Sequence, residues 1–331
     1  MTPEQVRDAL VREQRIAGVD LAGVDLSGWD LSGCRFERVR LSGANLSGAK
    51  LANADFSQVD LSGANLAHSD ANGASFCEVD LRGANAQVAQ WSRAYFRSCD
   101  FGSASFVEAQ LVRADAHESR FADTDFTRAN LFRLTAMNTD MTSAKLTQAS
   151  LHNAYLKGCD LKGQDLRSCN LTMTILNEAQ LQGANLGGVL LDRTSLIGAR
   201  LEGAVLAGAR GLYTALGEAQ LGQADLQGAS FVMADASGAS FAAVRANAVH
   251  WEKSVLQRTH WPRAALKGAR LLYCDLSHAD FSGADCSQAD LSGTNLHALQ
   301  QRDTRWDGAN LRGVRATDEA LARAEQWQPS V

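Results

Sequence analysis

The sequence repeats with a period of five residues over nearly its whole length. Written in fives, it reads VDLAG, VDLSG, WDLSG, CRFER, VRLSG and continues in one phase, without insertion or deletion, to ANLRG. The central residues, designated i, run from Leu21 to Leu311, a span of 290 residues that holds 59 repeats. They are apolar in every repeat except two, which have Gly211 and Gln301. Such a chain is expected to fold as a repeat array rather than as a globular domain.

A period of five fits neither an α-helix nor a long β-strand with alternating side chains. Each repeat instead predicts a short extended segment, in which residue i and a small residue at i−2 point inward, followed by a corner. Like residues recur every twenty positions, which predicts four repeats per coil and ladders of identical side chains. These residues are Phe36, Phe56, Phe76 and Phe96 at position i, and Asn45, Asn65 and Asn85 at position i−1.

The repeats fill residues 19–313 with no internal boundary, and a short segment lies at each end. Residues 1–18 open with Thr2 followed by proline, which suit the N-cap and first turn of a helix, so we expect an N-terminal helical cap. Residues 314–331 are expected to form a C-terminal cap or tail with a short helix that starts near Asp318. The apolar residues that share one face of this helix are Leu321, Ala324 and Trp327.

The repeats ANLSG, ADLQG and ADFSG resemble the A-(D/N)-L-x-x consensus of the pentapeptide-repeat family. The resemblance covers residues 19–313 and identifies no subfamily. It implies an all-β fold, a right-handed quadrilateral parallel β-helix, which at four repeats per coil would have about fifteen coils between short terminal caps. The leader LVREQRIAGVDLAGVDLSG also resembles pentapeptide proteins associated with bacterial secretion systems, including type VI loci. That likeness implies an effector or an apparatus component as partner.

Composition narrows the classes of function. The net charge of −5 is small for 331 residues and favours neither nucleic acid nor a membrane surface as a partner. No apolar run approaches the length of a membrane-spanning helix, and the N-terminus shows no secretory signal. Seven cysteines, an odd number without paired spacing, indicate a reducing compartment. We therefore expect a cytoplasmic protein, or one exported without a signal peptide, with no direct nucleic-acid contact and no membrane span.

The sequence contains no recognisable catalytic chemistry. The motifs GxSxG, GxxxxGK[ST] and HExxH are absent, so we expect no enzyme activity, no catalytic residue, no cofactor and no metal site. His250 and His260 are ten residues apart, which places them on opposite faces. Aspartates recur at position i−1 and are interpreted as a solvated face. Six cysteines are expected to be buried as small apolar residues, namely Cys34, Cys99, Cys159, Cys169, Cys274 and Cys286, and Cys77 to be exposed.

One wall of the predicted coil departs from the repeat. In ARGLYTALG (209–217), Gly211 replaces a leucine, and Leu212 and Tyr213 occupy positions that are usually Ser and Gly. The same departure recurs on this wall twenty and sixty residues later, as Val232-Met233 and Leu272-Tyr273. Outward positions of the wall between residues 112 and 273 carry six basic and two acidic side chains in a protein of net charge −5. An exposed mixture of Leu, Met, Tyr and Arg has the composition of an interface core.

These observations predict a partner-binding surface. Its residues are Met173, Leu190, Arg193, Arg210, Leu212, Tyr213, Val232, Met233, Arg270, Leu272 and Tyr273. Two alternatives remain open at this point: the wall is covered by a second copy of the chain, or its repeats have drifted without a partner. A homodimer through a terminal cap is a further possibility.

The predicted function is therefore a non-enzymatic protein–protein interaction scaffold, a rigid rod that presents one apolar, weakly basic wall to a protein partner. The alternative is a DNA-mimicking protein that binds gyrase or topoisomerase, as in the quinolone-resistance members of the family. Those members are acidic dimers, whereas this chain is longer and only mildly acidic, and its distinctive wall is basic and apolar.

Overall fold

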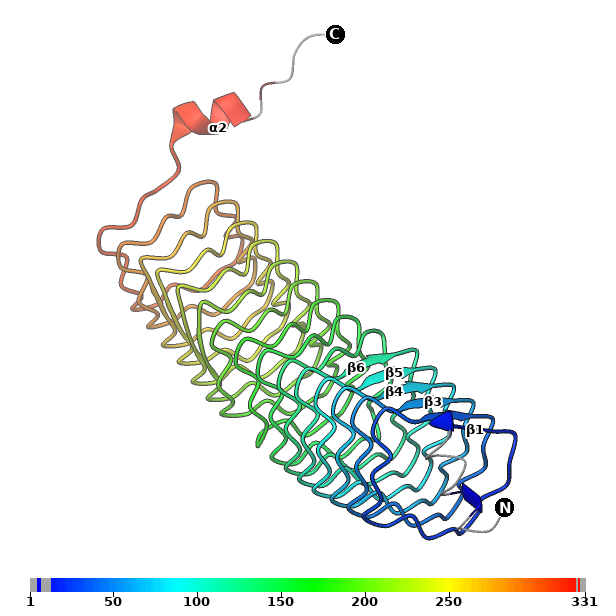
Figure 1. Ribbon diagram of the computed structural model, residues 1–331. Helices are drawn as coiled ribbons and strands as arrows, with labels where there is room; N and C mark the ends of the chain where they lie inside the picture. Colours follow the sequence, from blue (N-terminus) through cyan, green and yellow to red (C-terminus); the bar gives the residue numbers. More distant parts are fainter. Residues whose placement is uncertain (1–4, 7–12, 326, 328–331) are drawn as a thin grey trace. The chain divides into compact units, whose positions relative to one another are not determined.

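The computed structural model describes residues 5–6, 13–325 and 327 and shows a parallel β-solenoid (Figure 1). The Cα atoms pack into two compact units. The first comprises the described residues up to Leu161 together with Ser168–Ile175. The second comprises Lys162–Arg167 and the described residues from Leu176 onward. Both units consist of the same five-residue repeats.

Each unit contains one parallel sheet of three-residue strands. The first unit has a six-stranded sheet in the order β1 (Arg15–Ala17), β2 (Arg35–Glu37), β3 (Asp55–Ser57), β4 (Ser75–Cys77), β5 (Tyr95–Arg97) and β6 (Asp115–His117). The second has a four-stranded sheet in the order β10 (Arg270–Leu272), β9 (His250–Glu252), β8 (Ser230–Val232) and β7 (Arg210–Leu212). Every strand pairs with residues exactly one coil away, as Phe36 does with Phe56. Isolated parallel bridges with the same spacing of twenty residues connect the other faces. The predicted four repeats per coil are thereby confirmed.

The interior is filled by the central residues, as predicted. All those from Leu21 to Leu291 are buried. The rings of Phe36, Phe56 and Phe76 stack at centroid distances of 4.8 and 4.9 Å. The asparagine ladder is also present, because each side-chain amide donates to the asparagine carbonyl oxygen one coil earlier, at 3.3 and 3.4 Å. Identical residues therefore stabilise one another through their period of twenty.

The solenoid has about 13 turns among the described residues, slightly fewer than the fifteen that the count of repeats predicted. The last four repeats account for about one turn of this difference. Their central residues Leu296, Gln301, Trp306 and Leu311 are only partly buried or exposed, because no further coil packs on them. A count of repeats includes this final open coil, although it encloses no core.

Corners follow every extended segment, and the aspartates at position i−1 hold them. The residue at i+2 has a positive φ, for example 67° at Gly18 and 56° at Tyr213. Asp20 Oδ1 accepts a hydrogen bond from the backbone N–H of Ala22 at 2.9 Å, and this bond holds the pKa of Asp20 below its usual value. Asp285 has a lowered pKa through the Ser287 hydroxyl and backbone N–H. These acids therefore stabilise the corners as well as facing solvent.

We predict that acid destabilises the solenoid through these corners. A carboxylate whose pKa is lowered by folding contributes stability above its unfolded pKa of about 3.9, and this contribution is lost as the pH falls through the folded value. The temperature of unfolding should therefore change little down to about pH 4 and then fall steeply. Circular dichroism between pH 7 and pH 2 tests this. Because asparagine makes the same corner bond at Asn45, the Asp285→Asn/Asp290→Asn variant should keep the fold and lose less stability in acid.

The described residues include part of each predicted end structure. Most of the N-terminal cap expected over residues 1–18 lies outside the described residues, although Gln5 and Val6 are helical and Val6 is buried. At the other end, α2 (Glu319–Glu325) follows Asp318, whose carboxylate accepts the N–H groups of Ala320 and Leu321 as an N-cap. None of the residues of α2 is buried, so the shared apolar face of this helix is not covered.

The cysteines occupy the environments that the repeat predicted. All seven are free thiols, of which six are buried and Cys77 is partly exposed. Burial raises the pKa of Cys99 and Cys274 to about 12 and that of Cys159 to about 11. These buried thiols therefore remain protonated at neutral pH and act as packing groups.

Candidate functional site

The wall formed by strands β7–β10 gathers ten of the eleven residues predicted to bind a partner. The middle residue of each strand points inward, and the residues before and after it point outward. We call this surface the β7–β10 face. It comprises Leu190, Arg193, Arg210, Leu212, Tyr213, Val232, Met233, Arg270, Leu272 and Tyr273, all in the second unit. The eleventh residue, Met173, belongs to the first unit and is half-buried.

Several large apolar side chains of this face are open to solvent. Leu190 is 54% exposed, Tyr213 is 51% exposed and Tyr273 is 62% exposed. Leu212 and Met233 are each 41% exposed, and the remaining apolar members, Val232 and Leu272, are half-buried. Strand pairing aligns Leu212 beside Val232 within the sheet, and Glu252 of β9 separates this pair from Leu272.

The corner residues of this face carry their side chains at some cost in backbone energy. Tyr213, Met233 and Tyr273 have φ values of 56°, 52° and 55°, a region that costs L-residues about 1–2 kcal/mol. Glycine occupies the next corner, Gly293, where a Cβ atom would lie 2.5 Å from the Tyr273 ring. The Tyr273 ring therefore lies across the following coil. Other corners of the solenoid carry mostly polar non-glycine residues, such as Gln58, Glu78 and Arg93, so the large apolar side chains set this face apart.

Charge on the face is mainly basic. Arg193, Arg210 and Arg270 are exposed, and the first two form no ion pair within the described part of the chain. Strand β9 interrupts the apolar residues with Glu252, which pairs with Lys253 Nζ at 3.5 Å and His250 Nε2 at 3.5 Å. Arg193 and Arg210 thus add positive charge to the face without an ion-pair partner in the described part of the chain.

Gly211, beneath Leu212 and Tyr213, has a packing explanation. A Cβ atom built on it would lie 2.0 Å from Thr214 Oγ1 and 3.2 Å from the Phe231 ring. Thr214 Oγ1 donates a hydrogen bond to the Leu191 carbonyl at 2.9 Å, so this hydroxyl is fixed in place. Glycine is therefore required because Thr214 of the next repeat and Phe231 of the next coil already fill the space that a central leucine usually occupies.

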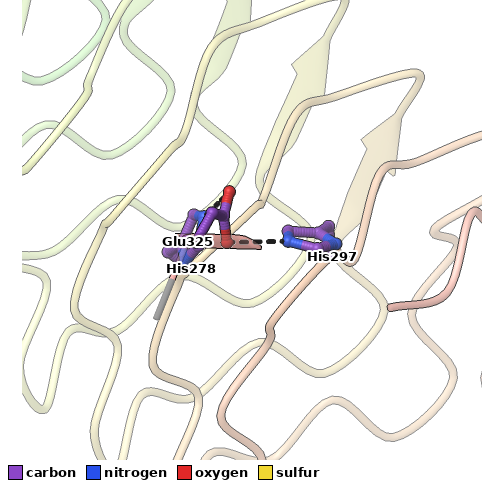
Figure 2. A group of neighbouring side chains, drawn as sticks. All are labelled: His278, His297 and Glu325. Carbon is purple, nitrogen blue, oxygen red and sulfur yellow. Dashed lines mark hydrogen bonds and ion pairs between the residues drawn. The ribbon is translucent and has the colours of Figure 1, made fainter. Parts of the chain in front are cut away.

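A second cluster lies where α2 meets the last coils. Glu325 of α2 lies between two imidazoles: its Oε2 is 3.1 Å from His297 Nε2, and its Oε1 is 3.4 Å from His278 Nε2 (Figure 2). One ligand atom from each residue lies within 4.8 Å of the other two, so the group could hold a metal ion. The cluster borders a depression of about 600 Å³ that Asp275, Arg315 and Asp318 also line.

The hydrogen bonds of His297 define the tautomer of its neutral ring. Its side chain is 6% exposed, and its Nδ1 accepts a hydrogen bond from the backbone N–H of Asp318 at 3.1 Å. The ring proton of the neutral imidazole must therefore lie on Nε2, which donates to Glu325. This bond is the largest cause of the lowered pKa of Glu325.

The sequence pattern predicts no metal site, so this cluster is a feature that only the structure shows. The repeat register does predict that the two histidines are neighbours, because residue 298 lies one coil after His278 and His297 precedes it. The structure agrees: the backbone N–H of His278 donates to the His297 carbonyl at 2.8 Å. Glu325, however, lies beyond the repeats, and no period places it. Its position depends on the direction in which α2 leaves the last coil.

A protein-family comparison matches most of the chain. The family model described as "Pentapeptide repeats" matches in eight copies, over residues 20–58, 60–90, 92–131, 137–172, 174–210, 213–242 and 263–297. None of the curated proteins compared with the chain matches it. No helix among the described residues is both long enough and apolar enough to cross a membrane.

Several solved structures are similar to this one. QnrB1, a plasmid-mediated fluoroquinolone resistance protein, is 23% identical over 57% of this chain and 91% of its own, with a TM-score of 0.39. A pentapeptide repeat protein from the thylakoid lumen of Arabidopsis thaliana is 33% identical over 32% of this chain and 67% of its own, with a TM-score of 0.24. HetL, involved in heterocyst differentiation regulation in Nostoc sp. strain PCC 7120, is 21% identical over 94% of each chain, with a TM-score of 0.18. At these values none of the three indicates a shared function.

Proposed function

Because the chain belongs to the pentapeptide-repeat family, whose repeat is a building unit rather than a catalytic site, we propose that it is a non-enzymatic protein–protein interaction scaffold. The β7–β10 face binds the partner. Leu212, Tyr213, Met233, Leu272 and Tyr273 are the apolar anchors. Binding is preorganised, since coil stacking fixes the strands that carry these residues before the partner arrives.

The observation that carries this proposal is the exposure of large apolar side chains on one sheet. Contiguous apolar patches are uncommon on monomeric soluble proteins unless they serve binding. Tyr and Arg are enriched in the residues that dominate binding energy at interfaces, and the face combines both types. Its exposed arginines favour a partner with an apolar centre and an acidic rim. We propose a cytoplasmic location, because the buried cysteines are free thiols.

Affinity capture from host lysate, followed by mass spectrometry, tests the face. The variant Leu212→Asp/Tyr213→Ser/Leu272→Asp should lose the partner, because two buried carboxylates at an interface centre would face apolar groups. We expect affinity to fall more than about 100-fold, the effect of two or more lost anchors. Circular dichroism should show the fold unchanged, since all three side chains point away from the core.

A matched control adds the same two negative charges to a different face of the second unit. Ile197 and Val255 are 43% and 38% exposed and lie on a wall other than the β7–β10 face. Ile197→Asp/Val255→Asp should retain the partner. Equal capture by the wild type and by the triple variant would contradict the proposal. Capture of gyrase by all three proteins would favour the DNA-mimicry alternative, and a shift from dimer to monomer only in the triple variant would indicate that a second copy covers the face.

A further inference from the structure

We propose that His278, His297 and Glu325 form a binding site for a divalent transition-metal ion, best matched by Zn²⁺, which joins α2 to the last coils of the solenoid. The site is independent of the β7–β10 face. Its three ligand atoms come from three places in the chain. His278 is a corner residue, His297 follows a central leucine one coil later, and Glu325 is the last residue of α2.

The distances between the ligand atoms suit a tetrahedral ion. Zinc–nitrogen and zinc–oxygen bonds of about 2.0–2.2 Å separate neighbouring tetrahedral ligands by about 3.3 Å. Each histidine is near this distance from a different carboxylate oxygen, 3.1 Å from Glu325 Oε2 to His297 Nε2 and 3.4 Å from Glu325 Oε1 to His278 Nε2, so a small rotation of the carboxylate suffices to present one oxygen to the ion. The two imidazole nitrogens lie within 4.8 Å of each other, and His278, whose side chain is 35% exposed, has room to turn toward the ion.

The ligand types select among metals. Two imidazoles and one carboxylate are the donors that zinc uses in sites with three protein ligands, which leave the fourth position to water. Calcium and magnesium require oxygen ligands almost exclusively, so this set disfavours them. The adjoining depression gives the fourth position access to solvent. Its lining contains Asp275, Asp318 and Glu325 against Arg258 and Arg315, an excess of one negative charge that favours a cation.

Metal binding rearranges one proton. Nε2 of His297 can coordinate only through its lone pair, so the ring proton moves from Nε2 to Nδ1. There it faces Asp318, whose backbone N–H currently donates to Nδ1. A carboxylate is the common acceptor for the second N–H of a metal-bound histidine. In the structure the Asp318 carboxylate instead accepts the N–H groups of Ala320 and Leu321, so coordination requires the start of α2 to shift until this carboxylate replaces the backbone N–H at Nδ1. Coordination is thereby linked to the start of the helix.

The site would stabilise a helix that has little else to hold it. Seven residues form a marginal helix in isolation, and none of the residues of α2 is buried. Its described links to the coils are polar: Glu325 to the two histidines, Asp318 to His297, and the Thr317 hydroxyl accepting the Ala298 N–H at 3.2 Å. A metal ion replaces the weak hydrogen bonds at Glu325 with coordinate bonds and so ties down the end of the chain.

Isothermal titration of the full chain with ZnCl₂ tests the proposal, on protein purified without a histidine tag. We expect one Zn²⁺ per chain in the wild type. His278→Asn, His297→Asn and Glu325→Gln should each lower the affinity more than about 100-fold, and Asp318→Asn, which keeps an N-cap, should lower it about 10–100-fold as an outer-shell change. The matched control His260→Asn removes an exposed histidine elsewhere in the second unit and should bind as the wild type does.

Limited trypsin digestion gives a second readout that does not depend on titration heats. Zn²⁺ should slow cleavage after Arg323 at least about tenfold in the wild type and in His260→Asn, and a chelator should reverse this protection. Glu325→Gln should be cleaved equally fast with and without the metal. Binding of unchanged affinity in the three ligand variants would mean adventitious metal only, and no saturable binding in the wild type would overturn the proposal directly.

Discussion

Replacement of Phe76 by alanine should lower the free energy of unfolding of the first unit by about 4 kcal/mol, in the range for a buried phenylalanine that leaves a cavity. Phe76 is fully buried and touches three rings: Phe56 at 4.9 Å, Phe96 at 5.1 Å and Trp91 at 5.0 Å between centroids. Its loss breaks the ladder in the middle. Stacked neighbours above and below cannot close the gap, because backbone bridges fix the spacing between coils.

The measurement should resolve individual coils, since long repeat arrays need not unfold in a single transition. Hydrogen exchange followed by mass spectrometry should show the largest loss of protection around β3, β4 and β5. Phe36→Ala is the matched comparison, because Phe36 is equally buried but stacks on a single ring, Phe56. Its cost should be smaller by about 1 kcal/mol, the contribution of the missing aromatic pairs. Equal costs for the two variants would show that ladder contacts add nothing beyond burial.

Replacement of Gly211 by leucine, the residue that the repeat would normally place there, should destabilise the second unit by about 3 kcal/mol, the upper range for overpacking. The Cβ atom alone would lie 2.0 Å from Thr214 Oγ1, so the Thr214 hydroxyl would have to leave the Leu191 carbonyl. The remaining atoms of the leucine would then meet Phe231. Leucine at position 211 would thus restore the sequence pattern but is expected to lower the stability of the second unit.

Urea denaturation, together with hydrogen exchange of β7 and β8, should measure this loss. Gly217→Ala is a suitable control: it lies in the next repeat, and its Cβ atom would be 3.7 Å from the nearest neighbour, the Ser237 carbonyl, which is ordinary contact. That variant should differ from the wild type by less than about 1 kcal/mol. If Gly211→Leu were as stable as Gly217→Ala, the packing explanation of Gly211 would be wrong.

The fold could be predicted from the sequence because every contact in a solenoid repeats. A residue in the array meets its neighbours twenty residues before and after, so the register that places Phe36 on Phe56 also places Arg210 beside Ser230. For the same reason, ten predicted partner-binding residues fall on one sheet. Their role in binding is a separate matter, and it stays a prediction until capture tests it. The sequence predicts only a solvated face for the aspartates at i−1. Their hydrogen bonds to backbone N–H groups could not be predicted, because these bonds depend on the conformation of the corner.

The sequence by itself determined the parallel solenoid, the four repeats per coil, the ladders and the burial of the cysteines, since each follows from a period of five and from contacts with the neighbouring coils. Only the tertiary structure decided three other features: the open final coil that reduces the number of turns, the crowding of Thr214 and Phe231 around Gly211, and the meeting of Glu325 with His278 and His297. The physical reason is that these features depend on side-chain volume at one place and on a helix outside the repeat. Neither is periodic, so neither could be obtained from the register.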